Sequence, residues 1–189
     1  ASILTYATDL SISKTRVVQL GGEAYFEVAH DRARPFIVKT ATQEVEVLGT
    51  HFNVNSYNDN GRTITTLAEG SVRVSSLRGT KQSLTLKPGE EAISQHNNIT
   101  VQPAAMETAL AWKNGYIMFK DAPLEEIMPQ VQRWYNVQVF YEGQISQREF
   151  SGGISRSSKL SVLLDILRDS RINFEMKETP QGKALIIKP

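Results

Sequence analysis

The chain has 189 residues, with 21 basic side chains, 20 acidic side chains and no cysteine. A net charge of +1 lacks the excess of Lys and Arg that neutralises phosphates, so we expect no nucleic acid partner. The absence of Cys excludes disulfides, thiolate metal sites and cysteine nucleophiles. Hydrophobic residues make up 40% and charged residues 22%, which is typical of a folded globular protein.

The first hundred residues contain short segments rich in Val, Ile, Thr and aromatic side chains, as strands favour. Two of them, Arg16–Leu20 and Ala24–Val28, flank Gly21-Gly22, which predicts a turn. Lys87–Glu90 places Pro and Gly as a type II turn requires. Strands at a spacing of about 8–12 residues without helices predict an antiparallel all-β domain over residues 1–102. A sandwich, a barrel and a short solenoid all remain open.

The pattern changes after Val101. Residues 103–115 form the predicted linker, opening with Pro103-Ala104-Ala105, and Met106–Trp112 fits one or two helical turns. Residues 116–189 alternate strand-like and helix-like segments and predict a small α+β domain of two β-α-β repeats. Its predicted strands are Tyr116–Phe119, Val137–Tyr141, Glu149–Ile154, Ile172–Met176 and Ala184–Ile187, with helices around Leu124–Tyr135 and Leu160–Leu167.

The two predicted helices carry apolar stripes at helical spacing. The stripes are Leu124, Ile127, Met128, Val131 and Trp134 in the first helix, and Leu160, Leu163, Leu164 and Leu167 in the second. We expect Pro123 in the first turn, a kink or loosening at Pro129, and a left-handed stop at Asn136. Ser157 or Ser158 is the expected cap of the second helix.

The usual motifs of catalysis and cofactor binding are absent from the sequence. His30, His51 and His96 lie on separate segments, with no carboxylate at metal-ligand spacing. There is no phosphate-binding Gly-rich loop and no nucleophile elbow. We therefore predict no enzyme activity, no catalytic residues, no cofactor and no metal. A dispersed pair of carboxylates, or a sugar platform around Trp134, is the alternative to solvated strands and a packed core.

Five segments in order along the chain resemble the FecR family of transmembrane anti-sigma regulators, in the form common in Bacteroidetes-type bacteria. They are residues 18–28 (VQLGGEAYFEV), 35–40 (PFIVKT), 44–54 (EVEVLGTHFNV), 67–74 (LAEGSVRV) and 86–90 (LKPGE). Residues 111–189 are similar to the domain that usually follows in this family. That domain is similar to the short N-terminal module of secretins and TonB-dependent transporters.

The resemblance implies a periplasmic signal-receiving region of a single-pass inner-membrane anti-sigma factor. Its expected partner is the periplasmic signalling domain of an outer-membrane TonB-dependent receptor for an iron chelate or a glycan. The regulated protein is an extracytoplasmic-function sigma factor, reached only through a cytoplasmic region absent from this chain. The alternatives are a carbohydrate-binding module and a structural envelope module.

The chain itself contains no apolar run of the ~18 residues that a membrane span needs, and no signal peptide. It begins at Ala1 without Met, so we expect a fragment of a longer, membrane-anchored protein.

The candidate partner-binding segment is the strand Glu149-Phe150-Ser151-Gly152-Gly153-Ile154. Its mixed polarity and Gly pair favour an exposed sheet edge, which is a template for pairing with a strand of another protein. Alternatively the strand is internal, and its glycines serve a bulge or a close backbone approach.

Overall fold

The computed structural model describes residues 1–57, 61–79, 82–96, 98–145 and 148–189. The chain divides into two compact units, Ala1–Leu110 and Ala111–Pro189. Within the predicted linker segment lie a short helix α1 (Met106–Leu110) and a 3-10 helix η2 (Ala111–Asn114). Among the described residues, none of the helices combines the length and the apolarity that a membrane crossing demands.

The N-terminal unit is all-β, which confirms the predicted fold class. Its strands are β1 (Ile3–Tyr6), β2 (Arg16–Val28), β3 (Phe36–Lys39), β4 (Gln43–Val47), β5 (Thr50–Ser56), β6 (Arg62–Glu69), β7 (Val72–Ser76), β8 (Ser83–Leu86), β9 (Glu90–Gln95) and β10 (Asn98–Pro103). They form one sheet in the order β10-β9-β6-β5-β2-β3-β4-β7-β8, with β1 also on β2. All pairs are antiparallel except β2–β3, which is parallel.

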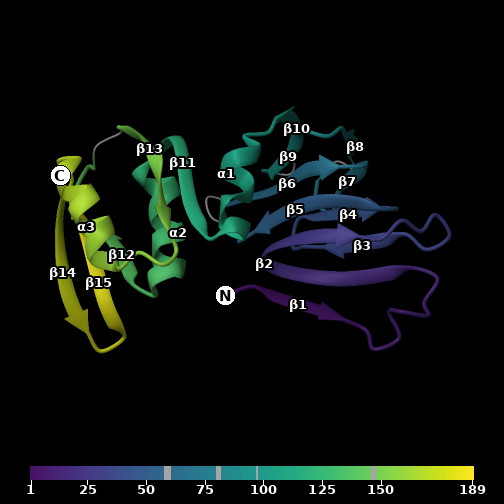
Figure 1. Ribbon diagram of the computed structural model, residues 1–189, viewed down its shortest axis with the longest axis horizontal. Helices are drawn as coiled ribbons and strands as arrows, with labels where there is room; N and C mark the ends of the chain where they lie inside the picture. The colour runs from purple at the N-terminus through teal and green to yellow at the C-terminus, as the bar shows by residue number, and fades with distance from the viewer. Residues whose placement is uncertain (58–60, 80–81, 97, 146–147) are drawn as a thin grey trace. The chain divides into compact units, whose positions relative to one another are not determined.

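This sheet curls into a nearly closed, barrel-like arrangement because successive hairpins alternate between two layers (Figure 1). The β3–β4 and β7–β8 hairpins lie in one layer, and the β5–β6 and β9–β10 hairpins lie in the other. Aliphatic and aromatic side chains fill the space between the layers. Phe26 and Phe52 stack there, with ring centroids 5.1 Å apart.

Strand β2 contradicts the predicted turn at Gly21-Gly22. Strand β2 continues through these glycines without reversing direction. Its first half pairs with β1 and β3, and its second half pairs with β5. Gly22 has φ 101°, and a Cβ atom there would lie 2.8 Å from Ser2 Cα. Glycines in a strand permit a bend and a close backbone approach without reversing the chain, and here they let β2 serve both layers.

The C-terminal unit is the predicted α+β domain. Its elements are β11 (Tyr116–Pro123), α2 (Leu124–Tyr135), β12 (Gln138–Tyr141), β13 (Glu149–Ser155), α3 (Leu160–Asp169), β14 (Asn173–Thr179) and β15 (Gly182–Lys188). The element order confirms two β-α-β repeats followed by a closing strand. However, the strands of one repeat do not share a sheet. The first strands of the two repeats, β11 and β13, pair with each other, and the second strands, β12 and β14, both pair with β15.

The helices of this unit turn the predicted stripes toward the core. Leu124, Ile127, Met128 and Val131 of α2 are buried, as are Leu163 and Leu167 of α3. The other stripe residues, Trp134, Leu160 and Leu164, are only partly buried. Asn136 has φ 52° and ends α2, as expected. Helix α2 continues through Pro129, and Pro123 lies at the N-cap position, just before the first turn.

The predicted serine cap of α3 is wrong. Lys159 holds the N-cap position and no side chain caps the helix. The Ser157 hydroxyl instead shares a hydrogen bond with the Ser155 hydroxyl, and the Ser158 N–H donates to Ser155 O. The two serines therefore close a turn that precedes the helix, which leaves their hydroxyls out of capping position.

Tyr141, at the end of β12, provides a titration test of this unit. Burial raises the pKa of its phenol to about 12, and the neighbouring Glu125 carboxylate adds to the shift. Because the folded state holds this proton more tightly, the associated stability is present below the ordinary tyrosine pKa of about 10 and is lost as the pH rises toward 12. We expect ultraviolet titration to detect a tyrosine that ionises at a pH near 12, a signal that is lost in Tyr141→Phe and shifts downward in Glu125→Gln.

Candidate interaction edge on the C-terminal unit

All six residues of the predicted partner-binding segment lie on β13. This strand pairs with β11 in a two-stranded antiparallel sheet, from Tyr116 opposite Ser155 to Pro123 opposite Glu149. Among the described residues, no other strand pairs with β13. Its second side is therefore a free sheet edge.

The pairing pattern identifies the backbone groups that face this free edge. The Arg156 N–H donates to Gly115 O at 2.7 Å, which makes these opposite residues a hydrogen-bonded pair. Along an antiparallel ladder such pairs alternate with non-bonded pairs. The backbone groups of Ile154 therefore face β11, whereas the N–H and C=O groups of Gly153 and Ser155 point away from it. Gly153 is exposed and Ser155 is half-buried.

Side chains on one face of β13 fix the strand to the core of the unit. Ile154 is only 5% exposed and belongs to the apolar cluster, and the half-buried Phe150 packs against that cluster. The Arg148 guanidinium lies over the Phe150 ring, 5.4 Å from its centroid. The strand is thus held rigidly while its outer edge stays open, which is the arrangement that strand addition needs.

The bulge of this sheet lies in β11, opposite Ser151. The register shifts between Phe119 and Ala122, and Asp121 in the bulge has φ 47°. Ser151 closes the bulge: the Asp121 N–H donates to Ser151 Oγ at 2.8 Å, and that hydroxyl donates to Asp121 Oδ1 at 2.9 Å. Sequence patterns alone do not reveal this role, because the two residues are 30 positions apart.

Gly153 lies where β13 comes close to a side chain of β11. A Cβ atom added there would lie 3.2 Å from Met118 Cγ. This contact is tight but involves a flexible side chain, so a small residue is compatible with the pairing.

Trp134 does not form an open sugar platform. It packs partly against the apolar cluster of the unit, and the Arg156 guanidinium covers its ring at 4.9 Å from the centroid. Among the described residues there is also no group of three or more His, Cys, Asp or Glu side chains able to hold a metal ion. His51 instead lies 3.2 Å from the Glu69 carboxylate.

Comparisons with known proteins relate this chain to anti-sigma factors. The family model for the FecR protein matches residues 1–73, and the model for the FecR C-terminal region matches residues 116–183. The chain belongs to the FecR family, a family of anti-sigma factors, which confirms the resemblance found in the sequence.

Two crystal structures of a "putative anti-sigma factor" from Parabacteroides distasonis ATCC 8503 are similar to the chain. Both are 25% identical to it, and each match covers 98% of this chain and 85% of the other. Their TM-scores are 0.83 and 0.80. Among curated proteins, no sequence matches the chain.

Proposed function

We propose that the chain is the periplasmic signal-receiving region of a membrane-anchored anti-sigma factor, and that it acts by binding without catalysis. Its partner is the periplasmic signalling domain of an outer-membrane TonB-dependent receptor. Binding alters the hold of a cytoplasmic region on an extracytoplasmic-function sigma factor. Within this proposal, residues 1–102 and 116–189 act as two domains, and the C-terminal one makes the receptor contact.

The free edge of β13 is the observation that carries this proposal. Sheet edges in folded proteins are usually protected by charged residues, proline or bulges on the edge strand. Between Phe150 and Ser155 the strand carries none of these, because its only charge is at Glu149 and the bulge lies in β11. A partner strand that pairs there gains hydrogen bonds to the outward N–H and C=O of Gly153 and to the outward N–H of Ser155, whose C=O already accepts from the Ser158 N–H.

The test compares two variants of Gly153 in co-purification with the signalling domain of the receptor. Gly153→Pro removes the outward N–H group and adds ring atoms on the free edge. Gly153→Ala adds the same Cβ atom toward Met118 but keeps the N–H. We expect Gly153→Pro to weaken binding at least about tenfold, because it removes a backbone hydrogen bond and blocks the approach of the partner. Gly153→Ala should bind within about threefold of the parent chain.

Circular dichroism and thermal melting establish that both variants fold. If folded Gly153→Pro binds as well as Gly153→Ala, strand addition at β13 is wrong, although the receptor partnership stands. If the parent chain captures no signalling domain at all, the partnership itself is wrong.

A further inference from the structure

The interior of the N-terminal unit becomes polar toward one end. On four strands, the inward-facing residues change from aliphatic to polar in the same direction. The changes are Val45 to Gln43 on β4, Leu67 to Thr65 and Thr63 on β6, Val74 to Ser76 on β7, and Ala92 to Ser94 on β9. The register confirms that these positions meet, because Gln43 lies opposite Ser76 and Thr63 lies opposite Ser94.

Two hydrogen bonds join the two layers at this end. The Thr42 hydroxyl donates to Thr63 Oγ1 at 2.8 Å, and Gln43 Nε2 donates to Thr65 Oγ1. Gln43, Thr65 and Ser94 are at most 5% exposed. The polar residues at this end are therefore buried and held by hydrogen bonds within the fold.

One buried group in this interior lacks a partner within the described part of the chain: Gln43 Oε1 accepts no hydrogen bond. Ser94 is only 5% exposed and lines a hollow at the end of the sheet. Buried polar groups without partners cost free energy, so a site that retains them commonly supplies them with water or a ligand.

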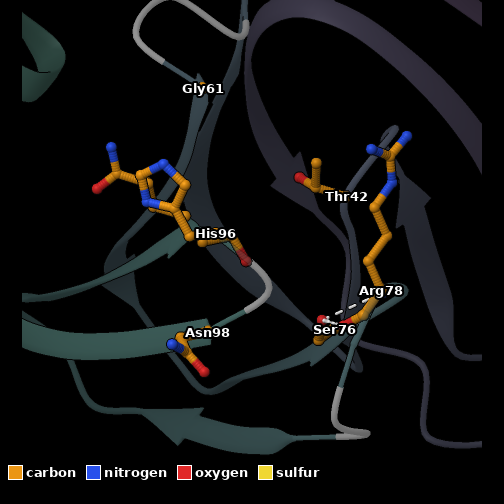
Figure 2. Close-up of a pocket in the computed structure, with 8 residues that line it drawn as sticks. Thr42, Gly61, Ser76, Arg78, His96 and Asn98 are labelled. Carbon is orange, nitrogen blue, oxygen red and sulfur yellow. Dashed lines mark hydrogen bonds between the residues drawn. The ribbon is translucent and has the colours of Figure 1, made fainter.

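The hollow that Ser94 lines has a volume of about 260 Å³. Residues from four hairpins line it, including Thr42, Ser76, Arg78, Ser94, His96 and Asn98. Figure 2 shows Arg78 and His96 on opposite sides of the hollow, with Thr42 and Ser76 near Arg78 and Asn98 below His96. The sequence alone does not bring these hairpins together.

The charges of the lining favour an anion. Among the described lining residues there is no Asp or Glu, and Arg78 supplies a full positive charge. The Arg78 guanidinium has no carboxylate partner in the described part of the chain. A guanidinium binds carboxylates and phosphates through two parallel hydrogen bonds. The described lining also contains no Phe, Tyr or Trp, so it lacks the ring on which a neutral sugar stacks.

We propose that this hollow binds a small hydroxylated anion that carries a carboxylate or a phosphate. Arg78 holds the oxyanion, and the Ser94 hydroxyl hydrogen-bonds the hydroxyl groups. The volume equals that of roughly eight or nine liquid water molecules, which fits a ligand of monosaccharide size. This site lies in the N-terminal unit and is independent of the β13 edge.

Isothermal titration calorimetry of the whole chain with three matched probes tests the proposal. The probes are glucuronate, glucose 6-phosphate and glucose, which share a ring but differ in the oxyanion. We expect at least one of the two anions to bind at least about tenfold more tightly than glucose, and the comparison of the two identifies the oxyanion. Equal binding of glucose, or binding of no probe, overturns the proposal.

Three variants locate the binding. Arg78→Gln should weaken binding of the anion at least about tenfold, and Ser94→Ala should weaken it about threefold. Arg73→Gln changes the net charge by the same amount but lies outside the hollow, where Arg73 Nη1 is 3.4 Å from Glu46 Oε2. Anion binding in Arg73→Gln should equal that of the parent chain. If Arg73→Gln weakens binding as much as Arg78→Gln does, the anion binds by diffuse charge and the site is wrong.

Discussion

Phe52→Ala should lower the free energy of unfolding of the N-terminal unit by about 3–5 kcal/mol. Phe52 is fully buried on β5, lies opposite Phe26 in the β2–β5 register and stacks on its ring at 5.1 Å. Alanine removes the ring and leaves a cavity where two layers of the barrel-like sheet meet. Since the total free energy of unfolding of such domains is only about 5–15 kcal/mol, this loss removes much of the stability.

Urea denaturation followed by far-ultraviolet circular dichroism measures this effect. Ile12→Ala is the control, because it also truncates a large hydrophobic side chain of the same unit but at a position that is 82% exposed. Its effect should stay within about 0.5 kcal/mol. A loss below about 1 kcal/mol for Phe52→Ala would contradict the placement of the Phe52 ring at the centre of the core.

Gly70→Ala should destabilise the same unit by about 2–5 kcal/mol, through two separable causes. Gly70 connects β6 to β7 and has φ 93°, a conformation that costs a side chain about 1–2 kcal/mol. An added Cβ atom would also lie 2.8 Å from Gly49 O, and relieving such an overlap costs typically about 1–3 kcal/mol more. The backbone of the neighbouring turn must therefore move.

Gly89→Ala separates these causes. Gly89 has a similar φ of 84°, but nothing lies within 4 Å of an added Cβ atom. It should therefore lose only the conformational part, about 1–2 kcal/mol. The difference between the two variants, measured by urea denaturation, gives the cost of the contact with Gly49. Equal losses would show that the two turns do not touch in solution.

The two proposed binding surfaces make different demands on the fold. The β13 edge uses backbone groups, so its specificity depends on the partner strand and on the rigidity that Ile154 and Phe150 confer. The hollow uses side chains from four hairpins and depends on the barrel-like sheet, to which Phe52 and Gly70 contribute. Variants of one surface should leave binding at the other surface unchanged.

Local patterns predicted most strands and both long helices because their side-chain periods are imposed by burial on one face. The same patterns failed where a distant part of the chain decides the outcome. Gly21-Gly22 has the composition of a turn, yet β2 continues through it because β1, β3 and β5 hold its two halves. Ser157 has the composition of a cap, yet its hydroxyl is taken by Ser155.

The candidate edge was identified from composition, but its geometry was not. Nothing in residues 149–154 indicates that β11 is their partner, that the bulge lies at Asp121, or that Ser151 closes it. The anion hollow left no signal in the sequence. Thr42, Ser76, Arg78 and His96 belong to three separate hairpins, each of which by itself has an ordinary hairpin composition.

The sequence by itself determined the class of each half of the chain, the apolar faces of its helices and the family to which it belongs. Those features depend on neighbouring residues, whose periodicity is set by the geometry of a single helix or strand. The tertiary structure alone decided which strands pair, which edge stays free and where polar residues of four strands meet. These depend on contacts between residues far apart in the chain, for which one sequence carries no local signal.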